Sequence, residues 1–167
     1  MAGAIYKQVI RLNLLPMKPS PKNMYYVAIQ ILLFVTYLFR IASIDLHTRP
    51  LFRYAGLALS ITGGALIIIA SIILKNNLTP FPSPKKTSIL ITTGVYKYIR
   101  HPIYTGILFT TAGYGVYSEN TLRLLVFILL LILFVSKAAY EELLLMNKFP
   151  EYSNYKKQTA ALLPGIY

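Results

Sequence analysis

The chain has 167 residues, of which 56% are hydrophobic and only 13% charged, and its formal net charge is +12. A soluble domain of this size usually has roughly 25% charged residues, so the composition indicates a protein embedded in a membrane. The absence of cysteine excludes disulfides, thiolate nucleophiles and cysteine-based zinc sites, and two histidines are too few for a histidine-only metal cage, so no metal is expected.

Residues 1–24 form a basic N-terminal segment. Its apolar residues Ile5, Val9, Leu12 and Leu15 are spaced by three or four, which is typical of a short helix lying in the membrane interface. The same stretch is equally compatible with a disordered basic lead-in, and the prolines that follow end it in either case. Because the segment has no long apolar run and no small-residue cleavage site, we do not expect a cleaved signal peptide.

Residues 25–74 contain two apolar runs, Tyr25 to Ile44 and Ala55 to Leu74, each long enough for a transmembrane helix of about twenty residues. Arg40 lies near the end of the first run, where its side chain can extend to the lipid headgroups without serving a further function. Glycines and a serine in the second run favour close packing against another helix.

Residues 75–99 are polar and irregular. Pro80, Pro82 and Pro84 exclude a membrane helix there. A loop of this length between compact helices is unusual, and loops of that kind are often functional. We interpret the segment as a cytosolic proline-rich loop, and we therefore discount the glycosylation motif that begins at Asn77.

Two more apolar helices follow. The third predicted span begins at Pro102, a residue suited to the first turn of a helix, and ends at about Tyr117. It is short for a full crossing, so we expect it to lie in a thinned or protein-lined region. The fourth span begins at Leu122 and continues through Val135, with helical character to about Asn147, so the two spans are predicted to form an antiparallel helical hairpin.

The tail from Phe149 to Thr159 is polar and rich in tyrosine. Its tyrosines are compatible with an aromatic belt at the membrane interface. They are equally compatible with a cover over a pocket, and the sequence does not decide between the two.

Basic residues are distributed unevenly between the two sides of these helices. Twelve lysines and arginines fall in the N-terminal segment, the long loop up to Arg100 and the tail, against three in the two opposite connections. Because basic residues favour the cytoplasmic side, both termini and the long loop are predicted to be cytoplasmic. The basic residues form no continuous stripe, so we expect membrane lipids as their partners and no nucleic acid.

Two groups of ionisable residues are predicted to meet at this cytoplasmic side. Glu141 follows Leu122 by nineteen residues, about 28 Å along a helix, which returns it to the depth of His101. Glu142 is about 100° away around the helix, so both glutamates can hardly face the same pocket. Lys137 lies one turn before Glu141 and can pair with it. The alternative is that these charges only mark the exit of the helix into water.

The residues around these groups resemble the isoprenylcysteine carboxyl methyltransferase family, and more narrowly its small prokaryotic members; phospholipid methyltransferases are more distant relatives. The resemblance runs from about Leu74 to the end of the chain. The matching motifs, in order, are Leu78-Thr79-Pro80-Phe81-Pro82-x-Pro84, Gly94-Val95-Tyr96-x-x-x-Arg100-His101-Pro102-x-Tyr104-x-Gly106, Glu141-Glu142-x-Leu144-Leu145, and Phe149-Pro150-x-Tyr152-x-x-Tyr155 with Thr159.

The resemblance implies an all-α, polytopic membrane methyltransferase with about four transmembrane helices. The last two helices and the tail, residues 100–167, would form a cytosolic pocket for S-adenosyl-L-methionine. Carried over residue by residue, the cofactor-binding residues would be Tyr96, His101, Pro102, Tyr104, Gly106, Glu141, Glu142 and Leu145. The catalytic residues would be Arg100, Tyr104 and Glu141, with Arg100 orienting a carboxylate of the cofactor or the acceptor.

The expected acceptor is a lipophilic small molecule or a lipid-linked carboxylate that enters from the bilayer. A phospholipid amine is the second candidate. Two readings from other classes remain: a transporter, which would need ionisable groups near mid-bilayer, and a non-catalytic membrane scaffold whose motifs only cap helices. The sequence leaves the oligomeric state open, and it does not say which of Glu141 and Glu142 faces inward.

Overall fold

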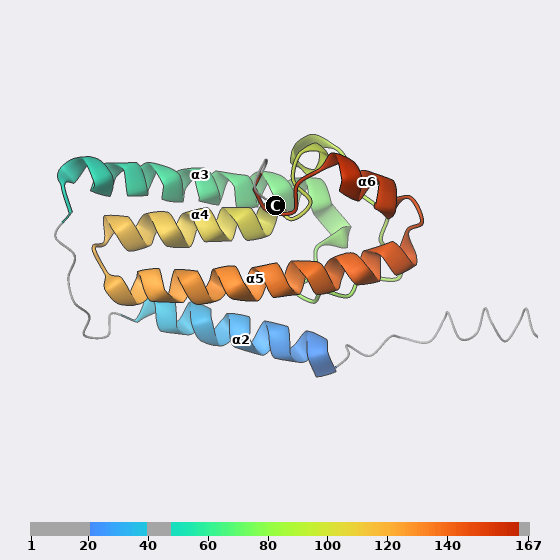
Figure 1. Cartoon of the computed structure of the whole chain (residues 1–167), viewed down its shortest axis with the longest axis horizontal. Coiled ribbons are helices and arrows are strands. Elements are labelled where there is room, and N and C mark those ends of the chain that lie inside the picture. The colour runs from blue at the N-terminus through green and yellow to red at the C-terminus, as the bar shows by residue number, and fades with distance from the viewer. Residues whose placement is uncertain (1–20, 40–47, 164–167) are drawn as a thin grey trace, which may run out of the picture.

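The computed structural model describes residues 21–39 and 48–163, and in these ranges it is built from helices, with one isolated β-bridge and no strand. The predicted all-α fold class is therefore confirmed. The expectations for the basic N-terminal segment before Pro21 and for Arg40 lie outside the described residues. The elements, shown in Figure 1, are α2 (Pro21–Leu38), α3 (Pro50–Leu74), the 3₁₀ turns η1 (Lys75–Asn77) and η2 (Gly94–Lys97), α4 (Pro102–Tyr117), α5 (Thr121–Lys148) and α6 (Tyr152–Gln158).

Four long helices lie side by side. α4 packs between α3 and α5, and α2 packs on α5 from the other side (Figure 1). The segments Pro50–Asn77 and Thr121–Lys148 are long and apolar enough to cross a membrane. The loops between α3 and α4 and the short helix α6 gather at the end where α4 begins.

Most helix boundaries follow local sequence signals. α4 has the predicted bounds because Pro102 begins it and Ser118 ends it. α5 begins after Asn120, whose side chain accepts a hydrogen bond from the backbone N–H of Arg123 at 3.1 Å. α3 begins at Pro50, earlier than predicted, because a proline is also favoured in the first turn.

α3 and α4 meet through glycines, so their backbones touch. We call Gly56, Gly63, Gly106 and Gly113 the glycine interface. A Cβ atom on Gly63 would lie 2.5 Å from the carbonyl oxygen of Gly106, and one on Gly113 would lie 2.4 Å from that of Gly56. Such distances leave no room for a side chain, so small residues are what allow this pair of helices to pack.

The segment after α6 is bound to the start of α4 by backbone hydrogen bonds. The N–H groups of Arg100 and His101 donate to Ala160 and Ala161 at 2.9 and 3.0 Å. The hydroxyl of Thr105 donates to the carbonyl of Leu162 at 2.6 Å. The segment thereby joins the buried core between α4 and α5, which contains Leu108, Val126, Leu130, Leu133, Phe134, Ala161 and Leu162.

Candidate functional site

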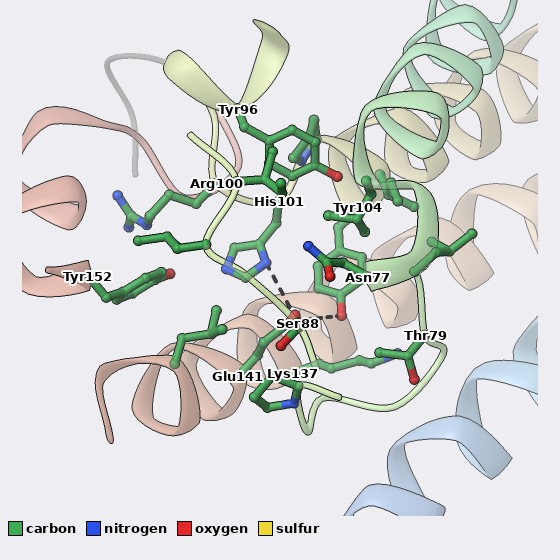
Figure 2. Close-up of a pocket in the computed structure, with 18 of the residues that line it drawn as sticks. Asn77, Thr79, Ser88, Tyr96, Arg100, His101, Tyr104, Lys137, Glu141 and Tyr152 are labelled. Atoms are coloured by element: carbon green, nitrogen blue, oxygen red, sulfur yellow. Dashed lines mark hydrogen bonds and ion pairs between the residues drawn. The ribbon is translucent and has the colours of Figure 1, made fainter. Parts of the chain in front are cut away.

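A cavity of about 380 Å³ lies at the end of the bundle where α4 begins. Its size is within the range of small-molecule sites, roughly 300–1,000 Å³. The loop after α3, the first two turns of α4, the last turns of α5 and α6 all contribute to its wall (Figure 2). The lining is mostly apolar, and its polar side chains include Gln30, Asn77, Thr79, Ser88, Tyr96, Arg100, His101, Tyr104, Lys137, Glu141, Tyr152 and Tyr155.

α5 presents one face to this cavity. Lys137, Glu141 and Leu145 follow one another at intervals of four residues, so they lie on the same side of the helix, and all three line the cavity. On the opposite wall His101 precedes the first residue of α4 and Tyr104 follows within its first turn.

Glu141, Tyr104 and His101 are in contact although they come from two helices. The Tyr104 hydroxyl donates to Oε2 of Glu141 at 2.8 Å, and Nδ1 of His101 lies 3.6 Å from the same oxygen. The Tyr104 ring is stacked between His101 and Phe134, with ring centroids 5.3 and 4.7 Å apart. The two residue groups predicted to share one depth are therefore neighbours in the structure.

Glu142 is held by Arg100, Lys156 and His101 of the protein itself. Its Oε1 lies 2.7 Å from Nε of Arg100 and 3.4 Å from Nε2 of His101, and its Oε2 lies 2.7 Å from Nζ of Lys156. We call these four residues the ion-pair cluster. The side chain of Glu142 is 6% exposed and does not line the cavity, whereas that of Glu141 is 24% exposed and does.

The two adjacent glutamates thus differ in what they offer a ligand. Both approach His101, one at each ring nitrogen, which the helical angle alone did not suggest. Only Glu141 presents its carboxylate to the cavity, because the carboxylate of Glu142 is occupied by its three partners.

The guanidinium of Arg100 is also bound to other groups of the protein. Besides Glu142, its guanidinium donates through Nη1 to the carbonyls of Lys156, at 3.1 Å, and Thr159. These contacts attach α6 and the residues after it to the start of α4. The role predicted for Arg100, orienting a carboxylate of the cofactor or acceptor, stays a prediction, and its side chain reaches the cavity wall.

The other candidate residues separate into two groups. Tyr96, Pro102 and Leu145 line the cavity. Gly106 does not; it belongs to the glycine interface, where an added Cβ would lie 2.6 Å from Cγ1 of Ile67. Its place in the motif is thus explained by helix packing.

Lys137 has partners that its position in the sequence did not reveal. It was expected to be able to pair with Glu141, but its Nζ donates instead to Oε1 of Gln30 at 2.6 Å and to the carbonyl of Pro80 at 3.0 Å. It also lies 5.3 Å from the centroid of the Tyr104 ring. Among the described carboxylates none forms an ion pair with it, so the cavity contains a buried cation with only neutral partners.

Tyr152 and Tyr155 cover the cavity from α6, as one of the two readings of the tail predicted. The Tyr155 hydroxyl donates to the carbonyl of Tyr96 at 2.6 Å. Burial raises the pKa of Tyr155 to about 12, so this phenol stays protonated and keeps its hydrogen bond at physiological pH.

The sequence is similar to a known family and to several known proteins. A model of the family described as phospholipid methyltransferase matches residues 51–152. The nickel-cobalt-cadmium resistance protein of Alcaligenes xylosoxydans xylosoxydans is 31% identical over 85 residues, 50% of this chain and 40% of that protein. The protein-S-isoprenylcysteine O-methyltransferase of Saccharomyces cerevisiae is 33% identical over 131 residues, 76% of this chain and 54% of that enzyme.

A solved structure shares the fold. The eukaryotic intramembrane Ras methyltransferase (isoprenylcysteine carboxyl methyltransferase) matches with a TM-score of 0.63 and 24% identity, over 90% of this chain and 55% of that one. The chain spans about half or less of the length of these relatives. Together with the two candidate membrane helices, the likeness indicates an integral membrane protein.

Proposed function

Because the chain belongs to the phospholipid methyltransferase family, we propose that it is a membrane methyltransferase that transfers a methyl group from S-adenosylmethionine to the carboxylate of a lipophilic acceptor. The resemblance to isoprenylcysteine carboxyl methyltransferases predicted from the motifs is confirmed. One observation carries the proposal: the cavity holds an accessible carboxylate, Glu141, and a cation, Lys137, that do not pair with each other.

The residues present fit the proposed cofactor. The carboxylate of Glu141 can accept hydrogen bonds from an ammonium group, a charge-assisted contact. The hydroxyl of Tyr152 is buried without a hydrogen-bond partner among the described residues, so it is available to a ligand. Apolar side chains on the loop wall, Leu78, Ile89 and Leu90, suit a nucleoside base.

The chain's own contribution to the reaction would be binding and positioning. When bound, the cofactor supplies an electrophilic methyl group on a sulfonium. An ionised carboxylate acceptor needs no general base, so orientation within the cavity can supply much of the rate. Tyr104 and His101 hold Glu141 in place, and the loop with α6 can limit the access of water.

Lys137 favours an anionic acceptor over an amine. In the cavity its ammonium attracts a carboxylate and repels the protonated amine of a phospholipid headgroup. Two of its hydrogen bonds go to Gln30 and Pro80, and an ammonium group has three donors, so one can reach a ligand. A phospholipid amine remains the second candidate, because Glu141 in the same cavity can attract a cation.

The proposed arrangement in the membrane has four transmembrane helices. α2 and α4 would cross beside α3 and α5, with α4 and α5 as the hairpin and both termini in the cytoplasm. Support comes from the distribution of basic residues, twelve against three, and from the polar loops and α6 gathered at the cavity end. At that end a polar cofactor enters from water and a lipophilic acceptor from the bilayer.

Methyl transfer by purified protein tests the proposal. Radiolabelled S-adenosylmethionine would be offered with an S-prenylated cysteine carboxylate and, separately, with phosphatidylethanolamine. We expect transfer to the carboxylate, and we expect Lys137→Met to lower kcat/KM for it about 10- to 100-fold, the cost of a hydrogen bond to a charged group. Affinity for S-adenosylhomocysteine should stay within about 2-fold in this variant.

The control is Lys157→Met, because Lys157 is an exposed lysine away from the cavity. Transfer to the amine and not to the carboxylate would overturn the acceptor class. Absence of both transfer and cofactor binding would overturn the proposal as a whole.

A further inference from the structure

Tyr152, the first residue of α6, carries a buried hydroxyl with no hydrogen-bond partner among the described residues. The residue is only 1% exposed, so bulk water does not reach it. Burial, together with the nearby carboxylate of Glu142, raises the pKa of the phenol, so the hydroxyl stays protonated as a donor. Buried polar atoms in folded proteins are almost always hydrogen-bonded, so this exception calls for an explanation.

The orphaned hydroxyl faces the cavity. Tyr152 is one of the residues that line it, and Figure 2 shows its side chain extending from α6 toward the side of the cavity where His101 and Glu141 lie. The ring packs edge-on against Tyr155 with centroids 5.7 Å apart. The two tyrosines differ in one respect, because the hydroxyl of Tyr155 is already bonded to Tyr96.

The ion-pair cluster holds the helix that carries Tyr152. Lys156, one turn further along α6, binds Glu142 of α5, and Arg100 donates to the carbonyl of Lys156. α6 is therefore attached to both other helices of the site. A donor fixed in this way is preorganised for a ligand and loses little entropy on binding.

We propose that Tyr152 is a ligand-binding residue whose hydroxyl donates a hydrogen bond to the carboxylate at the amino-acid end of the cofactor. The inference rests on the proposed function. Glu141 is the accessible carboxylate of the cavity and suits the ammonium of that end. The neighbouring carboxylate of the ligand then needs a donor on the same side.

The two cationic side chains that line the cavity, Arg100 and Lys137, are less suited to this role than the Tyr152 hydroxyl. The Nε and Nη1 groups of Arg100 are occupied by Glu142 and by carbonyls of the chain. The Nζ of Lys137 lies 5.3 Å from the centroid of the Tyr104 ring and already donates to Gln30 and to the carbonyl of Pro80. The hydroxyl of Tyr152 is a buried donor on the α6 side that has no hydrogen-bond partner among the described residues.

The test is Tyr152→Phe, which removes only the hydroxyl. Two nucleosides would be titrated into the purified protein: S-adenosylhomocysteine, which has the amino-acid end, and 5′-methylthioadenosine, which lacks it. We expect the affinity for S-adenosylhomocysteine to fall about 10-fold or more, as for a lost hydrogen bond to a charged group. We expect the affinity for methylthioadenosine to stay within about 2-fold, and the melting temperature of the ligand-free protein to be unchanged or higher.

Tyr155→Phe is the matched control. It breaks the hydrogen bond to Tyr96, so it should lower the melting temperature and change both affinities together. An unchanged affinity of Tyr152→Phe for S-adenosylhomocysteine, or an equal loss for both nucleosides, would overturn the inference while leaving the proposed function in place. Absence of S-adenosylhomocysteine binding by the unsubstituted protein would instead overturn the proposed function, and this inference with it.

Discussion

The glycine interface and the ion-pair cluster join α4 and the residues just before it to different neighbours: α3 in the first case, and α5 with α6 in the second. In the glycine interface, backbone packs on backbone, and the carbonyl of Gly106 occupies the space of a missing side chain on Gly63. In the ion-pair cluster, the side chains of Arg100, His101 and Lys156 converge on one buried carboxylate, that of Glu142.

One short sequence motif therefore serves two purposes. Arg100 and Gly106 stand six positions apart, yet Arg100 attaches α6 and Gly106 packs α3. Between them, His101 and Tyr104 face the cavity. The glycine interface is therefore expected to be sensitive to added volume, and the ion-pair cluster to lost charge.

The largest effect is expected from Glu142→Gln. The substitution keeps the shape of the side chain but leaves Arg100 buried without its counter-charge. Breaking a buried pair in this way costs about 3–5 kcal/mol of unfolding free energy. Loss of the ion pair with Lys156 adds little to this free-energy cost, because the Lys156 side chain is 43% exposed and water screens the pair. Denaturant or thermal unfolding in detergent would measure the change.

Glu151→Gln is the control for that measurement, because Glu151 is exposed and forms no described ion pair. Its effect should lie within about 0.5 kcal/mol. Equal stabilities of the two variants would show that the ion-pair cluster does not hold α6.

A smaller effect is expected at the glycine interface, where two adjacent glycines form a matched pair. A Cβ on Gly63 would lie 2.5 Å from backbone atoms of Gly106 and Thr110, whereas one on Gly64 would have nothing within 4 Å. Gly63→Ala should therefore cost about 1–3 kcal/mol through overpacking. Gly64→Ala should be neutral or slightly stabilising, because alanine favours a helix over glycine.

The same unfolding measurement decides this case. Similar stabilities of the two alanine variants would mean that α3 and α4 do not approach as closely as the structure shows. A loss at Gly63 that is accompanied by weaker cofactor binding in the folded variant would mean that the glycine interface and the site are coupled.

The bounds of the last two long helices can be predicted from local sequence signals. Pro102 and the polar turn at Ser118 mark the ends of α4, and the long apolar run marks α5, so their bounds follow directly. The contact of Tyr104 with Glu141 follows from helix length, because the rise of α5 brings its end back to the start of α4.

Contacts between distant segments were not predictable in this way. Lys137 bonds to Gln30, 107 positions away, and Arg100 bonds to Thr159, 59 positions away. Helical periodicity carries no information about such pairs. For the same reason α6 was not predicted: contacts with distant residues, among them Glu142, Arg100 and Tyr96, attach this short helix to the bundle.

Gly106 illustrates a second limit. In a motif next to Arg100, His101 and Tyr104 it was assigned to the cofactor site, whereas the structure places it against Gly63 and Ile67 of α3. A motif records which residues are required, but whether a glycine is required for a ligand or for a neighbouring helix depends on which face of α4 it occupies.

The proposed site is tested most simply by the binding of S-adenosylhomocysteine to the unsubstituted protein and to Glu141→Gln, measured by calorimetry in detergent. The substitution removes one charge and keeps an oxygen that can accept the hydrogen bond from Tyr104. We predict saturable binding by the unsubstituted protein and an affinity about 10-fold or more lower for Glu141→Gln, because a charge-assisted contact is lost. No binding by the unsubstituted protein, or equal affinities for the two proteins, would mean that this cavity does not hold a methyl donor through Glu141.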